Sequence, residues 1–552
     1  MPMAKLRIIP LGGLGEVGKN MTAFEYGDDI VVVDCGSIFP RQDMLGIDLV
    51  IPDISYLTRN RERVRAYLIT HGHEDHIGAV PYVFPHVPAP VYGTKLTCAL
   101  IHGKLTEHNI NGIALNVIKP RDTVRIGAFS VQFIHVSHSI AGAVAMAITC
   151  PAGTVIITGD FKIDYTPIDG EVTDLQTLAA WGSRGVLALM ADSTNIERPG
   201  YTMSEKKIGA TFHGLFKDAK GRIIIAMFAS NLHRIQQVVD NCVAFGRKIC
   251  FVGRSMINVT KLAMEIGELK IPQDVFIEIG DLECYEDHEI VVLTTGSQGE
   301  PMSGLTRMAN SEHRRLQIRE GDTVIISASP IPGNEIMVAR IVDQLYRCGA
   351  TVIYNRIADV HVSGHACQEE LKLVQALVRP KYFIPVHGEY RMLHRHAQLA
   401  KEMGLDDDHA IILEMGQALE LSEDEASITG PIQTGSVMVD GLGVGDVGNV
   451  VLRDRKHLSQ DGLIIVVVGV SRETGQVISG PELISRGFVY VRENEELISG
   501  ARSVAQSVLD RYERIEQSDW TPIKNGIKDE MHTYLFNLIK RNPMILPIIM
   551  ET

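Results

Sequence analysis

Five apolar, strand-like runs in this chain end in histidine or aspartate, and this recurrence restricts the possible folds more than any other feature. The runs are AYLIT before His71, SVQFIHVS before His138, TVIITG before Asp160, VLALMA before Asp192 and YFIPV before His387. Each residue alone has a simpler interpretation as a turn or capping residue, because Asp and His are common where strands end. Together they favour a layered sheet protein whose polar site lies at the carboxyl ends of its strands.

The segment LITHGHEDHIGAV carries the densest part of this pattern. It places His71, His73, Asp75 and His76 within six residues. A polar loop is the alternative interpretation. Three imidazoles and a carboxylate at this spacing are instead typical of a site for a borderline divalent metal such as Zn²⁺.

A glycine-rich segment, LGGLGEVGKN, raises a different possibility, because Gly13, Gly15 and Gly18 spell G-x-G-x-x-G after a strand-like run. A dinucleotide site needs a helix to begin at these glycines and an acidic residue about 20 positions later. Asp34 supplies the acid, but residues 21–26 and 30–33 alternate like two strands around a turn. The pattern therefore predicts a glycine-rich hairpin, and Asp34 needs another role.

The pattern of predicted strands and helices changes twice along the 552 residues of the sequence. Short apolar strands with few convincing helices, apart from residues 75–84, fill the first 200 residues. From about 205 to 355, helix-like and strand-like segments alternate, which indicates a parallel, doubly wound sheet. After these residues, short strands separated by turns are predicted again. We therefore expect the α/β segment to be inserted into the first domain. Glycine-rich residues 441–448 predict a linker before a small α/β appendage.

Bulk composition excludes several classes of protein. No apolar run approaches the roughly 18 residues of a membrane span, and MPMAKLRIIP lacks a signal-peptide layout, so we expect a cytoplasmic protein without membrane contact. Eight scattered cysteines without C-x-x-C favour reduced thiols. The formal charge of −14 argues against a surface coated for nonspecific nucleic-acid binding, but not against a local cleft that attracts phosphate.

H-x-H-x-D-H with Asp34 before it and His138 and Asp160 after it resembles the metallo-β-lactamase superfamily. GRSMINV, Asp192, HVSGHA and PVHGEY resemble the β-CASP nucleases of that superfamily, most closely the bacterial ribonuclease J family, over nearly the whole chain. The resemblance implies an αββα sandwich with an inserted doubly wound α/β domain and a small C-terminal α/β domain. The expected ranges are 1–204 and 356–430 for the sandwich, 205–355 for the β-CASP domain, 431–450 for a linker and 451–552 for the C-terminal domain.

The same resemblance implies roles for the residues of the centre. His71, His73 and His138 would hold one zinc ion, Asp75, His76 and His387 a second, and Asp160 would bridge them, with Mn²⁺ or Mg²⁺ as possible substitutes. Asp34 would orient ligands from behind. His365 is the candidate general acid, with Asp192 beside it; phosphate binding alone is the alternative role for His365.

Two further sites follow from the resemblance. FASNLHR and HVSGHA resemble a pocket for a 5′-terminal monophosphate, which would contain Ser230, Asn231, His233, His361, Val362, Ser363, Gly364 and His365. Asn231 has the equal alternative of simply capping the helix that begins at Leu232. A structural calcium site is possible at Gly46, Asp48 and Asp446, which equally suit turns.

The function implied is a zinc-dependent ribonuclease, a 5′→3′ exonuclease that prefers 5′-monophosphate ends and also cuts internally, in RNA maturation (including rRNA processing) and mRNA decay. The expected partners are RNA, further copies of the chain in a homodimer or homotetramer, and other RNA-decay proteins. The alternatives are a nuclease for single-stranded DNA, which the histidine of PVHGEY disfavours by resemblance, a hydrolase of small esters, which the inserted domain disfavours, and a non-catalytic RNA-binding scaffold.

Overall fold

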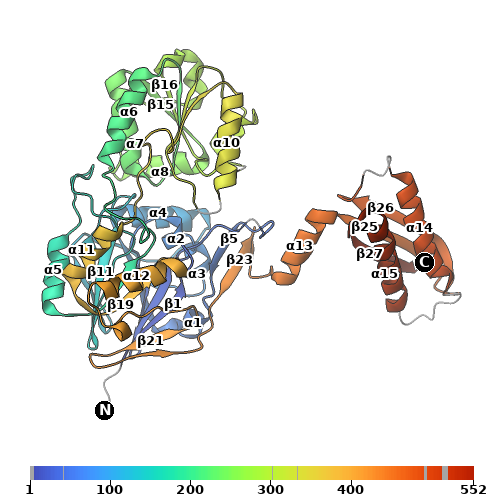
Figure 1. Ribbon diagram of the computed structural model, residues 1–552, viewed down its shortest axis with the longest axis horizontal. Helices are drawn as coiled ribbons and strands as arrows, with labels where there is room; N and C mark the ends of the chain where they lie inside the picture. The colour runs from blue at the N-terminus through green and yellow to red at the C-terminus, as the bar shows by residue number, and fades with distance from the viewer. Residues whose placement is uncertain are drawn as a thin grey trace. The chain divides into compact units, whose positions relative to one another are not determined.

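The computed structural model divides into two compact units, residues 1–39 with 49–437 and residues 40–48 with 438–552 (Figure 1). The longer segment of the second unit begins at residue 438, within the range 431–450 predicted as a linker. Among the described residues, no helix has the length and apolarity needed to cross a membrane. The structure describes residues 5–41, 43–300, 302–331, 334–489, 494–511 and 520–551.

Two sheets form the sandwich of the first unit. The eight-stranded sheet has the order β22 (Ala426–Thr429), β21 (Ala418–Leu421), β1 (Leu6–Gly12), β3 (Met21–Tyr26), β4 (Asp29–Val33), β6 (Val64–Leu68), β7 (Val91–Gly93) and β8 (Leu115–Val117). The six-stranded sheet has the order β19 (Pro380–Val386), β13 (Val186–Asp192), β12 (Gly153–Ile157), β11 (Val144–Cys150), β10 (Phe129–His135) and β9 (Thr123–Ile126).

The two sheets pack face to face through alternate apolar side chains. Phe24 of β3 and Leu68 of β6 share one buried cluster with Phe133 of β10 and Met146 of β11. The outer face of the six-stranded sheet is covered by helices, as Val374 and Leu399 join Phe383 of β19 in a second cluster. The helices of this part are α1 (Ser55–Arg59), α2 (Glu74–Ile77), α3 (Val80–Val83), α4 (Lys95–Glu107), α5 (Leu175–Arg184), α11 (Gln368–Val378) and α12 (Tyr390–Glu402).

The chain leaves this sandwich after β13 and returns to it with α11 and then β19, which lies parallel to β13 with Asp192 opposite Val386. The intervening segment forms a five-stranded parallel sheet between helices, as Figure 1 shows. This confirms the αββα sandwich with an inserted doubly wound α/β domain. Its strands, in sheet order, are β15 (Lys248–Val252), β16 (Ile290–Thr294), β14 (Ile223–Ala226), β17 (Thr323–Ile326) and β18 (Thr351–Ile353).

Helices cover both faces of the inserted sheet because its strands are apolar on both sides. Ile223 of β14 packs with Phe212 and Ile235 on one face, and Ile224 packs with Met308 and Ile341 on the other. The helices on the first face are α6 (Lys206–Asp218), α7 (Leu232–Phe245) and α8 (Arg254–Glu265), and those on the second are α9 (Gly304–Ala309) and α10 (Glu335–Arg347).

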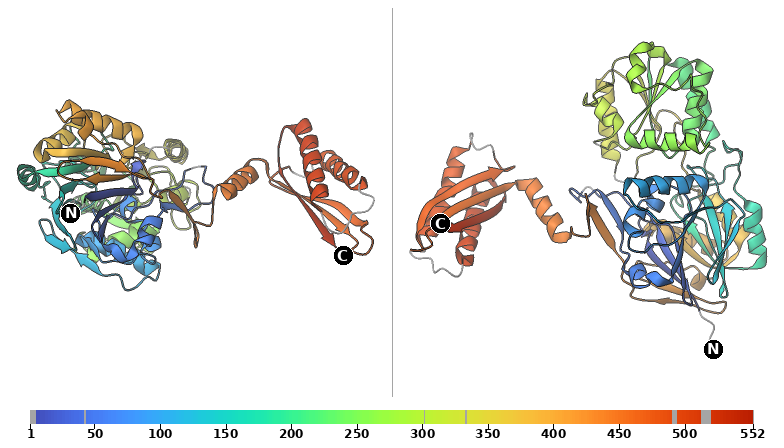
Figure 2. Two further views of the ribbon diagram at one scale, coloured as in Figure 1. Left: turned by 90° about the horizontal axis from the view of Figure 1, so that it is seen from below. Right: turned by 180° about the vertical axis from the view of Figure 1, so that it is seen from behind.

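The second unit contains the C-terminal α/β domain. Two of its helices cover one face of a three-stranded sheet (Figure 2). Val466 of this sheet packs with Ala505 and Ile527 of the helices. Its elements are the hairpin β23 (Ser436–Asp440) and β24 (Gly443–Val444), helix α13 (Asn449–Asp461), strands β25 (Leu463–Val470), β26 (Val477–Arg486) and β27 (Met544–Glu551), and helices α14 (Glu495–Asp510) and α15 (Thr521–Ile539).

Strand direction explains why polar residues meet at one edge of the sandwich. β10 runs antiparallel to β11 and β11 antiparallel to β12, while β12, β13 and β19 are parallel. β10, β12, β13 and β19 therefore all point the same way, and β4 and β6 are parallel in the facing sheet. The residues that follow these strands consequently lie at common sheet edges.

The glycine-rich segment is a hairpin and not the start of a helix. Within residues 13–34, all of them described, β2 (Leu14–Gly15) and β3 lead directly to β4. Gly13 has a φ of 85°, and β2 pairs with β20 (Gly388–Glu389) directly after His387. The rejection of a dinucleotide site is consistent with this backbone.

Candidate metal centre

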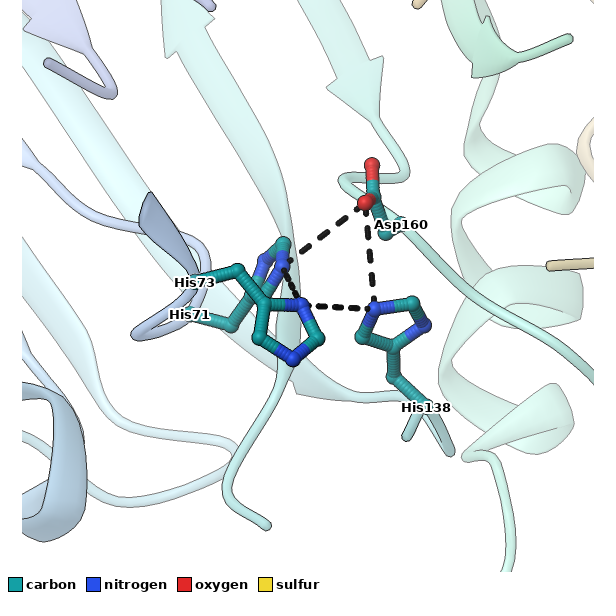
Figure 3. A group of neighbouring side chains, drawn as sticks. All are labelled: His71, His73, His138 and Asp160. Atoms are coloured by element: carbon teal, nitrogen blue, oxygen red, sulfur yellow. Dashed lines mark hydrogen bonds and ion pairs between the residues drawn. The ribbon is translucent and has the colours of Figure 1, made fainter. Parts of the chain in front are cut away.

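Four ligand-type side chains converge in a first set, shown in Figure 3: His71, His73, His138 and Asp160. The Nδ1 atom of His73 lies 3.0 Å from Nε2 of His71 and 3.2 Å from Nε2 of His138. The Oδ2 atom of Asp160 lies 3.7 Å from Nε2 of His71 and 3.8 Å from Nε2 of His138. These atoms come from the turn after β6 and from the ends of β10 and β12.

A second set contains Asp75, His76 and His387 and shares Asp160 with the first. Nε2 of His76 lies 3.3 Å from Oδ2 of Asp160 and 3.6 Å from Oδ2 of Asp75. Nε2 of His387 lies 3.2 Å from Oδ2 of Asp75, and its Nδ1 lies 3.4 Å from Oδ1 of Asp160. The carboxylate of Asp160 thus lies between two groups of imidazoles. All seven predicted ligands lie together in one centre.

The donor atoms of both sets fit metal ions. Four ligands about 2.0–2.3 Å from a tetrahedral zinc ion lie about 3.3–3.7 Å from one another, close to the separations found here. Nitrogen from histidine and oxygen from aspartate are donors that zinc accepts, and manganese also takes such mixed sets. Asp160 is 3% exposed and is the member common to both sets. The residues therefore fit a site for two ions that share a carboxylate.

The electrostatics of the first set prepare its imidazoles for this role. Burial, assisted by neighbouring imidazoles, lowers the pKa of His71 well below its usual value. Burial also lowers the pKa of His138 well below its usual value and that of His73 to about 4. All three rings are consequently neutral near pH 7, the state in which histidine binds a metal.

In the second set, the pKa values of the imidazoles are raised instead of lowered. Burial lowers the pKa of His387, but the carboxylates of Asp160, Asp192 and Asp75 outweigh it and raise the pKa to about 10. In His76, burial is likewise outweighed by Asp160, Asp75 and Asp34, and its pKa rises. Without metal, protons on these rings balance the surrounding carboxylates, so metal binding here releases protons.

Asp34 and Thr70 lie behind the ligands. Oδ2 of Asp34 accepts a hydrogen bond from Nδ1 of His76 at 2.8 Å, which leaves Nε2 of that ring to face the centre. Oδ1 of Asp34 accepts from the backbone N–H of Thr70 at 2.8 Å, and Oγ1 of Thr70 lies 3.0 Å from Nδ1 of His71. This arrangement fixes which nitrogen each ring presents, as carboxylates behind metal-binding histidines do.

His365 and Asp192 form a pair beside the centre. Nδ1 of His365 lies 2.7 Å from Oδ2 of Asp192 and 3.9 Å from Oδ2 of Asp160. Burial lowers the pKa of His365, but the two carboxylates outweigh it and raise the pKa above its usual value. A protonated imidazole held next to the ligands has the properties of a general acid. Asp160, Asp192, His365 and His387 also form a third group with ligand-like spacing.

The glycine-rich hairpin borders the centre from one side. The backbone N–H of His387 donates to the carbonyl of Gly13 at 3.1 Å, and that of Asn20 donates to the carbonyl of Asp75 at 2.9 Å. A Cβ on Gly36 would lie 1.6 Å from the same Asp75 carbonyl, so only glycine permits this approach. A cavity of about 30 Å³ between the hairpin and the two ligands His76 and Asp160 is large enough for one or two water molecules.

Comparison with known proteins places this centre in a family. Four family descriptions match: "Metallo-beta-lactamase superfamily" over residues 14–192, "Ribonuclease J, beta-CASP domain" over 220–345, "Zn-dependent metallo-hydrolase RNA specificity domain" over 351–412, and "Ribonuclease J C-terminal domain" over 450–552. The chain is 44% identical to Ribonuclease J2 of Bacillus subtilis over 99% of this chain and 98% of that protein. The chain belongs to the ribonuclease J family.

Other relatives support the same assignment. Ribonuclease J of Thermus thermophilus is 41% identical over 100% of this chain and 96% of its own length. Ribonuclease J 1 of Streptococcus pyogenes is 42% identical over 98% and 97%. A crystal structure of a protein of unknown function from Enterococcus faecalis V583 aligns with a TM-score of 0.54 at 18% identity, over 76% of this chain and all of that one, which shows the fold alone.

The structure brings the predicted phosphate-pocket segment of this ribonuclease J family member to the edge of the metal centre. The carbonyl of Gly364 lies 2.7 Å from Nδ1 of His138. Oγ of Ser363 accepts from Nδ2 of Asn195 at 2.8 Å and from the backbone N–H of His365 at 3.2 Å. Since this oxygen already accepts two hydrogen bonds, its own hydrogen is directed to another acceptor. The buried side chain of Val362 packs into the core of the inserted domain.

The FASNLHR residues divide between capping and ion pairing. Oδ1 of Asn231 accepts from the backbone N–H of Arg234 at 3.1 Å and caps α7, as its alternative interpretation supposed. Nε2 of His233 lies 3.2 Å from Oδ2 of Asp169. The carbonyl of Ser230 accepts from the backbone N–H of Leu232. The part of Ser230, Asn231 and His233 in binding phosphate stays a prediction.

The possible calcium residues lie together in the second unit. Oδ2 of Asp48 accepts from the backbone N–H of Gly441 at 2.8 Å, and the carboxylate of Asp446 lies beside Gly443. Gly46 has a φ of 74°, and the guanidinium of Arg455 lies next to it. A calcium ion would share this loop with an arginine, and the calcium site stays a prediction.

Several functional neighbours were not predicted from sequence. Thr70, Thr194 and Asn195 hold Asp34, His387 and Ser363 respectively. Each lies within three residues of a predicted site residue or strand end. Closeness in sequence to these residues was the only signal. Threonine and asparagine are common in turns, so this signal does not separate the three supporting residues from ordinary turn residues.

Proposed function

We propose that this protein is a ribonuclease that hydrolyses RNA phosphodiesters with two zinc ions, or with manganese or magnesium in their place. The observation that carries the proposal is the convergence of seven ligand-type side chains, Asp160 being the one common to both sets, with the His365 and Asp192 pair beside them, in a ribonuclease J family chain. Its relatives are named ribonucleases, and the region 351–412 matches an RNA specificity domain.

Bound metal ions supply an activated water and positive charge for the phosphate oxygens. The chain's own residues do the rest. Asp34 and Thr70 hold the rings of His76 and His71 so that the correct nitrogen faces the centre. Asp192 accepts from Nδ1 of His365 and stabilises its imidazolium, whose second N–H protonates the departing 3′ oxygen.

The predicted phosphate pocket supports a proposal for the direction of cleavage. The carbonyl of Gly364 lies next to Nδ1 of the predicted ligand His138. The hydroxyl oxygen of Ser363 accepts hydrogen bonds from two N–H donors, so its own hydrogen points away from both. A 5′-terminal monophosphate bound here would leave room for about one nucleotide before the metal ions. We propose 5′→3′ exonuclease activity that prefers 5′-monophosphate ends, together with endonuclease activity on strands that enter internally.

In the cell, this activity belongs to RNA maturation, including rRNA processing, and to mRNA decay. We propose a cytoplasmic homodimer or homotetramer that has RNA as its substrate and other RNA-decay proteins as possible partners. Single-stranded DNA is the alternative substrate, and a non-catalytic RNA-binding scaffold is the alternative role.

The test compares one RNA carrying a 5′-monophosphate, a 5′-triphosphate or a 5′-hydroxyl, with and without a chelator, beside a DNA of matched sequence. We expect metal-dependent degradation of RNA that is fastest from the monophosphate end. Undiminished cleavage after metal removal would refute the metal centre, and equal rates on DNA would favour the alternative substrate. Full metal occupancy without cleavage of either polymer would indicate the scaffold.

A further inference from the structure

A fully buried arginine connects the inserted domain to the predicted phosphate pocket. Arg234, in the first turn of α7, has an exposed fraction of 0%. Its Nε and Nη2 donate to the two carboxylate oxygens of Glu205 at 2.7 and 3.1 Å. Its Nη1 donates to the carbonyl of Ser327 at 2.8 Å and lies 3.1 Å from Nδ1 of His361. The side chain is thus held by two other segments while it contacts the histidine.

This contact determines where the His361 ring carries its proton. A guanidinium has only N–H donors and does not lose its proton in proteins. Nδ1 of His361 must therefore accept, and the remaining hydrogen lies on Nε2. We propose that Arg234 is a positioning residue that fixes His361 as a neutral Nε2–H donor for the 5′-terminal phosphate of RNA; this inference rests on the function proposed above.

The charges around the ring support a neutral form. Burial and, after it, the nearby cations Arg234, Arg198 and Lys162 together lower the pKa of His361 to about 3. A neutral N–H still donates to a phosphate dianion, and its state does not change between pH 5.5 and 8.

The loop that carries His361 links it to the reaction centre. Four residues further along, Asp192 holds His365 and His138 contacts the carbonyl of Gly364. Four residues span at most about 14 Å, so one end of the loop is fixed at the metal ligands and the other at Arg234. The arginine therefore fixes both the protonated nitrogen and the position of the donor at the His361 end of this loop.

Two substitutions at His361 separate the ring nitrogens. The amide nitrogen of glutamine reaches about as far from the backbone as Nε2, whereas that of asparagine reaches about as far as Nδ1. With 5′-monophosphorylated RNA, we expect His361→Asn to raise KM by about 10-fold or more, with kcat little changed, since hydrogen bonds to charged groups have this strength. His361→Gln should stay within about threefold of the unaltered chain.

The tautomer itself is measured by NMR of the full chain containing ¹⁵N-labelled histidine, with the His361 signals assigned by their loss in His361→Gln. We expect a neutral ring protonated at Nε2 from pH 5.5 to 8. In Arg234→Lys, which keeps a cation beside Glu205, the ring should populate both tautomers and KM for the monophosphorylated RNA should rise.

Arg222→Lys is the matched control. Arg222 is a second buried arginine of the inserted domain and forms a similar two-pronged ion pair with Asp322, with distances of 2.8 and 2.6 Å. It should leave the His361 spectrum and KM unchanged. A ring protonated at Nδ1, or equal KM for the asparagine and glutamine variants, would overturn the inference. Absence of any 5′-monophosphate preference in the unaltered chain would instead refute the proposed function.

Discussion

At the scale of single residues, Asp34 is the most informative position behind the ligands. It accepts hydrogen bonds from His76 and from the backbone and hydroxyl of Thr70 while its own φ is 62°. A left-handed aspartate is uncommon and tends to occur where surrounding structure holds it in place. Asparagine tolerates the same backbone, so Asp34→Asn changes the hydrogen bonding while it preserves the shape.

We predict that Asp34→Asn lowers the affinity for zinc by about 10- to 100-fold, as loss of a partner behind a metal ligand usually does. Titration of the metal-free protein against a competing chelator measures this directly. Asp174→Asn is the control, because Asp174 caps α5 and is bonded to Arg121 at the surface. Equal zinc affinity in both variants would contradict a role for Asp34 in holding His76.

A second prediction separates chemistry from end recognition. His76→Ala removes a ligand and should abolish all cleavage, because the second set loses one of its two imidazoles. Ser363→Ala removes a hydroxyl of the predicted phosphate pocket and should weaken chiefly the degradation that depends on a 5′-monophosphate. Product lengths from one end-labelled RNA, followed over time, distinguish the two, and parallel loss of every product would argue against separate roles.

Sequence predicted the residues of the centre better than their surroundings. The ligands stand at the ends of strongly apolar strands, so their meeting at one edge follows from strand direction. The supporting contacts do not follow in this way. Ser193, after β13, bonds His396 of helix α12, and Asn195 bonds Ser363 from 168 residues away; neither pairing has a periodic signal in the chain.

At the scale of elements, α12 carries a buried histidine that makes a testable contribution to stability. His396 is 1% exposed, packs edge-on to Phe383 of β19 with ring centroids 4.7 Å apart, and has Nδ1 3.0 Å from Oγ of Ser193. Burial lowers its pKa to about 3, against the opposing influence of Asp192. The folded chain therefore keeps the ring neutral at pH values where the unfolded chain protonates it.

The sign of the effect follows from linkage. Below about pH 6.5 the unfolded state binds a proton that the folded state does not, so stability falls as pH falls from about 6.5 toward 3, by up to about 1.4 kcal/mol per pH unit. We predict that His396→Phe reduces the drop in Tm between pH 7.5 and 5.5. The same substitution at exposed His394 is the control, and an unchanged drop in the His396 variant would contradict the neutral, buried ring.

The bounds of helices and strands could be predicted where apolar residues recur at a clear period along the sequence. The helix expected over NLHRIQQVVDNCVAF is α7 (Leu232–Phe245), and the strand expected over RKICFVG is β15 (Lys248–Val252). Helices α4 and α5 of the sandwich were not expected. The α4 sequence KLTCALIHGKLTE mixes glycine, threonine and cysteine with scattered apolar residues, so packing on the sheet, and not an apolar stripe of its own, stabilises it.

At the scale of the whole molecule, the second unit bears on assembly. Its sheet has α14 and α15 on one face, while apolar side chains of the opposite face remain exposed. Leu546 and Ile484 flank Ile465 across the strands and are 44% and 38% exposed, and Ile548 beside Val467 is 43% exposed. An apolar sheet face of this kind is typical of an association surface. The domain bounds expected from the sequence stay a prediction, which limited proteolysis would test.

We predict that the full chain, of 60.8 kDa, forms a dimer or tetramer and that Ile548→Glu shifts it toward the monomer. A carboxylate at this position would have to be buried without a partner in a copy-to-copy contact, which costs several kcal/mol, whereas in the free sheet it faces water. Light scattering at several concentrations measures the mass. Ile428→Glu, at a 49% exposed position on β22 of the first unit, is the control.

The metal centre makes this assembly prediction separable from the chemical ones. All seven predicted ligands lie in the first unit, so a monomeric Ile548→Glu variant should bind zinc like the unaltered chain and still cut short RNA. Its rate on long RNA would then report whether a second copy assists binding of the substrate. Loss of zinc together with loss of assembly would contradict two units that fold around separate cores, and unchanged mass would place the association surface elsewhere.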